Sequence, residues 1–269
     1  MKQRVSKIGV FDSGLGGLSV LRTLQRELPT CSFVYLGDTA RTPYGSKSPS
    51  TVVRYSQECA SFLGKHDIDL LVVACNTASS VALDEISQAV ACPVIGTIKP
   101  AVRTCLAMRV SHSELAERPI GIIGTRATIQ SASYQEEIRR AAPSAALIAS
   151  ACPLFVPLVE EGMTSGPIVE QAIEHYLAPF RNEGVSSLIL ACTHYPLLMG
   201  PIREFMGPRV EIVECADAIA REIKETFEQP ENGTGESHFF VTDEVSRFNS
   251  LASFFLKGAA VEAVKVEAL

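Results

Sequence analysis

The sequence lacks the segments that direct a protein into or across a membrane. No apolar run approaches the roughly 20 residues of a membrane-spanning helix. The basic start, residues 1–4, is followed by the apolar run 8–11, which is far shorter than the core of a signal peptide. We therefore expect a cytoplasmic protein without a membrane partner.

The eight cysteines include no Cys-x-x-Cys pair. The two that lie closest in the sequence, Cys92 and Cys105, are 13 positions apart. This spacing excludes a zinc ribbon, a thioredoxin motif and haem attachment, and no cluster of histidines offers a metal site. In a reducing compartment most such cysteines are small, buried apolar residues.

Positive charge is scarce as well. Lysine and arginine number 24 against 30 acidic residues, which gives a formal net charge of −6. This balance argues against a nucleic-acid partner. The glycine-rich turn at residues 12–17 fits neither the dinucleotide-binding fingerprint nor a Walker loop. Its glycines and the helix that follows instead suit a small-molecule ligand of carboxylate size.

Short apolar runs alternate with helix-length segments along the first 98 residues. This alternation predicts strands at 7–11, 32–36, 70–75 and 93–98, with helices at 18–28, 52–63 and 79–90. Strands that are separated by helices form a parallel sheet, so we expect a layered α/β domain.

The pattern then starts again. The run Ile120–Thr125 repeats the run Ile8–Ser13, and the apolar strand before Cys192 repeats, 117 positions later, the one before Cys75. Two repeats in the same order indicate a duplicated unit. The expected fold is α/β, with two similar layered domains, mainly parallel sheets and a pseudo-twofold relation between the halves. Further strands are expected near 144–151, 188–191, 210–213, 239–242 and 261–266.

Polar side chains gather at the expected carboxyl ends of the strands, where parallel α/β proteins place their active sites. A single cysteine there, activated by His194, would suit a cysteine hydrolase. Two equivalent thiols, Cys75 and Cys192, suit a reaction that removes a proton from one face of a carbon and returns one to the other. Thiols fit this task because thiol and thiolate are both accessible near neutral pH. The pattern favours racemisation or epimerisation in a cleft between the domains.

Four motifs resemble those of the glutamate racemase family. In chain order they are DSGLGG (12–17), DTARTPYG (38–45), ACNTAS (74–79) and CTHYP (192–196). The resemblance extends from Ile8 to at least Val213. It implies an isomerase that needs no cofactor, interconverts L-glutamate and D-glutamate, and supplies D-glutamate for peptidoglycan synthesis.

The resemblance also implies roles for individual residues. Cys75 would act on the D enantiomer with help from Asp12, and Cys192 on the L enantiomer with help from His194. The implied substrate contacts are Ser13, Pro43, Tyr44, Gly45, Asn76, Thr77, Thr125 and Thr193. Two further acids, Asp38 and Glu160, match family positions with accessory roles.

Domain organisation follows from the same resemblance, because the domains of this family are discontinuous. It implies a first domain of residues 1–98 plus 211–269, a second of residues 99–210, and a homodimer. Two alternatives stay open. An aspartate racemase uses the same two-thiol chemistry on a shorter dicarboxylate, and a two-lobed amino-acid binding protein would have no turnover. Binding alone gives the paired thiols no role, which speaks against the second alternative.

Overall fold

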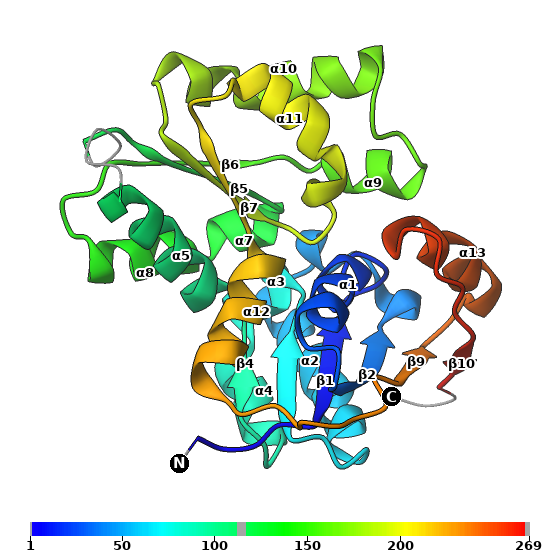
Figure 1. The fold of residues 1–269 in the computed structure, drawn as a ribbon. Coiled ribbons are helices and arrows are strands. Elements are labelled where there is room, and N and C mark those ends of the chain that lie inside the picture. Colours follow the sequence, from blue (N-terminus) through cyan, green and yellow to red (C-terminus); the bar gives the residue numbers. More distant parts are fainter. Residues whose placement is uncertain (1, 112–116, 267–269) are drawn as a thin grey trace.

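Two parallel β-sheets organise the chain, and helices pack against both of them (Figure 1). The computed structural model describes residues 2–111 and 117–266. The first sheet contains β1 (Lys7–Asp12), β2 (Ser32–Gly37), β3 (Leu70–Val73), β4 (Val94–Ile95), β9 (Ser237–Val241) and β10 (Ala263–Lys265). The second contains β5 (Ile120–Gly124), β6 (Leu147–Ala151), β7 (Ser187–Ala191) and β8 (Glu211–Glu214).

The helices lie between these strands in the sequence. In the first half they are α1 (Leu18–Glu27), α2 (Pro49–Gly64), α3 (Asn76–Val81), α4 (Leu83–Ala89) and α5 (Ile98–Ser111). In the second half they are α7 (Arg126–Gln130), α8 (Ser133–Ala141), α9 (Phe155–Glu160), α10 (Pro167–Asn182), α11 (Met199–Met206), α12 (Cys215–Thr226) and α13 (Val245–Phe255). Short 3-10 turns occur at Thr39–Arg41, Tyr44–Ser46 and Tyr195–Leu198.

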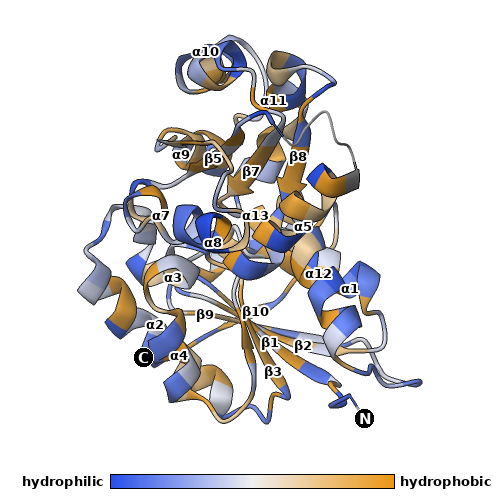
Figure 2. Ribbon diagram, turned by 90° about the vertical axis from the view of Figure 1, so that its left-hand side faces the viewer, coloured by the Kyte–Doolittle hydropathy of each residue, from blue (hydrophilic) through white to orange (hydrophobic). Residues whose placement is uncertain are grey.

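The central strands form from continuous apolar runs because both of their faces are covered. Every residue of β3, β5 and β7 is buried. Such runs are typical of parallel strands with helices on both sides. Figure 2 shows hydrophobic residues on the strands and on the helix sides turned toward them, whereas the outer side of α8 is hydrophilic. The predicted layered α/β fold is thereby confirmed.

The predicted duplication is confirmed by the strand order. In the first sheet the order is β2-β1-β3-β4, with β9 and β10 added beyond β2. The second sheet repeats it as β6-β5-β7-β8. Ile8 pairs with Phe33 and Leu70, and Ile120 correspondingly pairs with Leu147 and Ser187. The two repeated sequence runs therefore occupy equivalent strands.

Two element predictions around the first cysteine are wrong in part. The helix predicted at 79–90 begins earlier, at Asn76, because the Cys75 sulfur accepts the Ala78 N–H and caps it. It is then divided at Ala82 into α3 and α4. The strand predicted at 93–98 has only two residues, since the Thr97 N–H donates to the Ser79 hydroxyl instead of to a neighbouring strand.

The chain crosses between the sheets twice, after β4 and after β8. The C-terminal strands β9 and β10 belong to the first sheet. The strand Glu211–Glu214 departs from the predicted boundary after residue 210, because it pairs with β7 in the second sheet. A four-residue strand does not reveal its partner from sequence. Helix α12 starts directly after it and packs against both α1 and α5 (Figure 1).

No helix within residues 2–111 and 117–266 is both long enough and apolar enough to cross a bilayer.

Candidate active site

The carboxyl ends of both sheets meet at one small cavity of about 30 Å³. Cys75 follows β3 of the first sheet, and Cys192 follows β7, the equivalent strand of the second. Both thiols line the cavity, together with Ser13, Thr42, Pro43, Tyr44, Gly45, Asn76, Thr77, Thr125, Val156, Thr193 and His194. The duplicated strand ends thus bring two thiols to one space.

The structure brings most of the predicted site residues to this cavity. All the predicted substrate contacts line it, and so do Cys75, Cys192 and His194. The predicted acids Asp12, Asp38 and Glu160 do not line the cavity themselves. Each forms a hydrogen bond with a residue that does: Asp12 with Thr193, Asp38 with Tyr44, and Glu160 with His194. Two lining residues were missed. Thr42 lies inside the quoted DTARTPYG motif, whereas Val156 comes from α9 and has no polar signal in the sequence.

Cys75 occupies an apolar and negatively charged environment. Its sulfur lies 3.4 Å from the Ser13 hydroxyl. Burial raises the pKa of the Cys75 thiol to about 12, and the neighbouring Asp12 carboxylate adds to this rise. Asp12 makes no direct hydrogen bond to Cys75; it accepts the Gly14 N–H at 3.0 Å and the Thr193 hydroxyl at 3.5 Å. Cys75 is therefore set up as a protonated thiol.

Cys192 has a different neighbour. Its sulfur lies 3.9 Å from Nδ1 of His194, and Nε2 of the same ring lies 3.1 Å from Oε1 of Glu160. Burial alone would lower the pKa of His194, but its contacts with Cys192 and Glu160 raise it to about 10. Although burial opposes it, the same pairing lowers the pKa of Glu160. An imidazolium thus stands between the second thiol and a carboxylate, ready to exchange a proton with the sulfur.

Asp38 anchors the loop that forms one wall of the cavity. Its buried carboxylate accepts hydrogen bonds from the Tyr44 hydroxyl, from Nε of Arg41 at 2.7 Å and from the Thr242 hydroxyl at 2.9 Å. Because the Tyr44 hydroxyl is engaged in this way, Tyr44 presents its backbone and ring to the cavity. Asp38 therefore stabilises the loop that contains Arg41 and Tyr44 without lining the cavity itself.

Three threonine hydroxyls join the two domains beside the cavity. Thr77 lies 3.0 Å from Thr125 and 3.3 Å from Thr128, and Thr125 lies 3.0 Å from Thr128. Thr77 and Thr125 are predicted substrate contacts, and buried Thr128 was not predicted because it lies one helical turn behind the strand end. A ring of hydroxyls can donate to a carboxylate oxygen when one of its members turns outward.

Two glycines allow the domains to approach each other closely. A Cβ atom on Gly16 would lie 2.2 Å from Oγ1 of Thr193 and 2.5 Å from Nδ1 of His194. A Cβ atom on Gly45 would lie 2.6 Å from Cβ of Thr125. Both contacts join the first domain to the second, so any larger residue would hold the sheets apart at the cavity.

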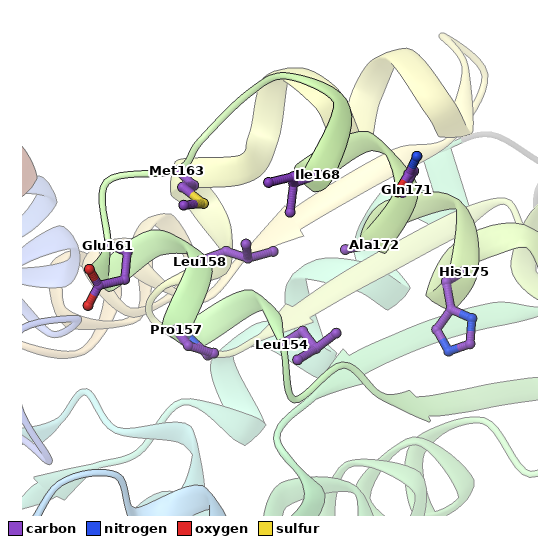
Figure 3. Close-up of a pocket in the computed structure, with 9 residues that line it drawn as sticks. All are labelled: Leu154, Pro157, Leu158, Glu161, Met163, Ile168, Gln171, Ala172 and His175. Carbon is purple, nitrogen blue, oxygen red and sulfur yellow. The ribbon is translucent and has the colours of Figure 1, made fainter.

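A larger cavity, of about 630 Å³, lies elsewhere in the second domain. Figure 3 shows its lining, mostly apolar side chains of α9, α10 and the loop between them, with Glu161 and His175 at its edges. It contains no thiol and none of the predicted site residues. In the described ranges, no three His, Cys, Asp or Glu side chains are grouped so that they could hold a metal ion.

Comparison with known proteins points to one family. A model of the Asp/Glu/hydantoin racemases matches residues 8–223. The chain is 46% identical over 256 residues to a glutamate racemase of Aquifex aeolicus, which covers 95% of this chain and 96% of the relative. It is 44% identical over 256 residues to one of Geobacter metallireducens, with 93% of each chain covered. The crystal structure of a Francisella tularensis glutamate racemase in complex with D-glutamate has a TM-score of 0.86, 32% identity and 97% coverage of both chains.

The pair formed by His194 and Glu160 predicts a pH-dependent loss of stability. Contacts with Cys192 and with Glu160 raise the pKa of His194 from 6.5 to about 10. The protonated ring therefore stabilises the fold fully below pH 6.5 as long as Glu160 is ionised, which its lowered pKa ensures down to at least pH 4.5. This contribution is lost as the pH rises through about 10. We expect Glu160→Gln to lower the free energy of unfolding at pH 7 by about 1.5–3 kcal/mol, typical of a hydrogen bond to a charged group. The deficit should shrink above pH 10 in urea titrations.

A matched control is the adjacent Glu161→Gln. Its side chain is 70% exposed and lies 3.9 Å from Arg247, so the change should stay within about 0.5 kcal/mol. A deficit of Glu160→Gln that is the same at pH 7 and above pH 10 would contradict the assignment of an imidazolium to this pair.

Proposed function

The chain belongs to the Asp/Glu/hydantoin racemase family, and we propose that it interconverts L-glutamate and D-glutamate by passing the Cα proton between Cys75 and Cys192. One observation carries this proposal: two thiols on equivalent strand ends of two duplicated sheets line the same cavity. It is supported by relatives named glutamate racemase at 44% and 46% identity over nearly the whole chain. The protein is an isomerase.

The environments of the two thiols suggest which one acts first. Cys75 holds its proton, because burial and Asp12 raise its pKa to about 12. Cys192 lies beside His194; when the thiol proton resides on the imidazole ring, the two residues form a thiolate and imidazolium pair. In this state Cys192 removes the Cα proton of L-glutamate, and Cys75 delivers a proton to the opposite face. The product is D-glutamate, and the two sulfurs have exchanged protonation states.

The chemical difficulty is the negative charge that develops on the substrate carboxylate when the Cα proton leaves. Donors that face this charge lower the barrier, and one such donor typically contributes about 2.7–4 kcal/mol. The candidates are the side chains of Asn76, Thr77 and Thr193, all of which line the cavity. Thr125 and the backbone of the loop at Tyr44 and Gly45 are the corresponding candidates for the side-chain carboxylate.

Glutamate is favoured over aspartate as the substrate because of the identity to named glutamate racemases. A binding protein without turnover remains disfavoured, since it would have no use for Cys75 and Cys192. We place the reaction in the cytoplasm, where the eight cysteines stay free thiols. The product would serve peptidoglycan synthesis.

Two structural assignments belong to the same proposal. Strand pairing supports a second domain that extends through Glu214, and a first domain formed by the N-terminal part and the chain after that residue. A homodimer is the assembly that the family resemblance implies. Sedimentation of the purified protein measures the mass of the assembly.

The proposed function is tested by proton NMR in D₂O without added pyridoxal phosphate. Each enantiomer of glutamate and aspartate is incubated with the purified protein. We expect both glutamate enantiomers to lose the Cα proton signal and their optical rotation, with little change for aspartate. Preferred turnover of aspartate would identify the alternative racemase, and no exchange with any of the four would favour a binding protein.

Replacing one thiol separates the two halves of the reaction. In Cys75→Ser, we expect racemisation to fall by more than about 10³-fold, because the serine hydroxyl is a poor acid and base at neutral pH. Cys192 would still exchange the Cα proton of L-glutamate with D₂O, whereas D-glutamate should keep its proton. Cys192→Ser should show the reverse preference.

The control for both thiol variants is Cys92→Ser, which removes a partly exposed thiol away from the cavity and should keep full activity. Undiminished racemisation by Cys75→Ser would refute the two-thiol mechanism. Loss of activity in all three variants would point to a general requirement for thiols in folding.

The close approach of the domains at Gly16 should be essential for turnover. Gly16→Ala places a methyl group against Thr193 and His194, and misplacement of reacting groups by about 1 Å costs roughly 100-fold in rate. We therefore expect kcat/KM to fall by about 100-fold. Gly200→Ala in α11, where a Cβ atom would meet nothing within 4 Å, is the matched control and should keep kcat/KM unchanged. Equal kcat/KM in the two variants would show that this contact is dispensable.

A further inference from the structure

Within residues 2–111 and 117–266, the carboxamide of Asn76 forms hydrogen bonds through its oxygen but not through its nitrogen. Its Oδ1 accepts the Tyr134 hydroxyl at 2.6 Å and lies 3.5 Å from the Cys215 sulfur. Its Nδ2 is buried and has no hydrogen-bond partner among the described residues. A buried amide nitrogen without a partner is costly unless a ligand accepts its protons. Since Asn76 lines the cavity, the substrate is the acceptor that this nitrogen lacks.

We propose that Tyr134 is a positioning residue, whose hydroxyl holds the Asn76 carbonyl so that the amide NH₂ group faces the substrate carboxylate. The inference rests on the proposed function. In the opposite orientation, the amide oxygen would face a carboxylate and repel it. The hydroxyl of Tyr134 prevents this rotation because its proton is donated to Oδ1. Tyr134 does not line the cavity, so it acts on the substrate only through Asn76.

Tyr134 lies close to the two points where the chain crosses between the sheets. Its hydroxyl lies 3.3 Å from Oγ1 of Thr97 and 3.3 Å from the Cys215 sulfur. Thr97 directly precedes α5 and Cys215 begins α12, so both residues lie where the chain crosses between the sheets. Groups at the crossing points move least when two domains separate. Asn76 is therefore oriented before the substrate arrives, which is the preorganisation that lowers a barrier most effectively.

Helix α8 is fixed against α3 by a second contact from the neighbouring residue. The Ser133 hydroxyl donates to the Ser80 carbonyl at 2.7 Å. Tyr134 itself is fully buried, so its ring has no freedom to swing away from Asn76. The helix of the second domain thus delivers its hydroxyl to a side chain of the first domain in a fixed position.

The test is a double-mutant cycle on Tyr134 and Asn76, measured as kcat and KM for both glutamate enantiomers. Tyr134→Phe removes only the hydroxyl, and we expect kcat/KM to fall about 10-fold, mainly through kcat. Asn76→Ala removes the donor itself and should cost about 100-fold or more. In the Asn76→Ala background, Tyr134→Phe should have less than about a twofold further effect. Tyr176→Phe, a tyrosine on α10 away from the cavity lining, should keep wild-type kinetics.

Two outcomes would overturn the proposal. One is a wild-type kcat/KM in Tyr134→Phe. The other is a full 10-fold effect that persists in the Asn76→Ala background, because that would mean that Tyr134 supports the fold and not the amide. Thermal unfolding of the four proteins of the cycle shows directly whether any of them has lost stability.

Failure of the proposed function would be visible separately, in the wild-type protein. If wild type does not racemise glutamate, the same four proteins are compared by calorimetric titration with D-glutamate. The positioning role then predicts that Tyr134→Phe weakens binding only when Asn76 is present. Equal weakening in both backgrounds would overturn it.

Discussion

The contact between the carboxyl ends of the two sheets determines the rest of the site. Gly16 allows the first domain to reach Thr193 and His194, and the Ser19 hydroxyl donates to the Thr193 carbonyl at 2.9 Å. The cavity that remains has about 30 Å³, room for about two water molecules. Glutamate needs more space than this. The described structure is therefore a closed state, in which the two thiols are isolated from solvent and their electrostatic surroundings act at full strength.

The closed state explains why burial controls the protonation of this site. Cys75 and His194 are both enclosed, yet the pKa of Cys75 and that of His194 are raised for opposite reasons. For Cys75 the loss of water and the charge of Asp12 disfavour the thiolate. For His194 the contacts with Cys192 and Glu160 outweigh the loss of water and favour the cation. Rehydration would therefore lower the pKa of Cys75, whereas for His194 it would remove the effect that opposes the cation.

Much of the site could be predicted from sequence because it depends on a local pattern. The carboxyl ends of parallel strands share one edge of a sheet, so a strand that ends in Cys75 and its repeat ending in Cys192 were enough to predict a shared site. Residues that reach the site through tertiary packing gave no such signal. Val156 and Tyr134 come from helices α9 and α8, and neither residue stands at the end of a strand. The pairing of Glu211–Glu214 with the second sheet was missed for a related reason: the choice of partner depends on where the chain crosses, not on the four residues themselves.

The two halves of the fold are duplicated, but the two halves of the chemistry are not. Asp12 lies near Cys75, whereas His194 lies beside Cys192, although the two cysteines follow equivalent strands. This asymmetry cannot favour one enantiomer at equilibrium, because L-glutamate and D-glutamate have the same free energy in solution and kcat/KM must be equal in both directions. The asymmetry does determine which thiol holds the proton in the free enzyme. The free enzyme therefore already has the protonation state that one of the two enantiomers requires. Equal kcat/KM can then be reached with unequal kcat and KM, since the enzyme must change its protonation state before it accepts the other enantiomer. A symmetric fold with asymmetric charges thus biases the kinetics of each direction without disturbing the equilibrium between them.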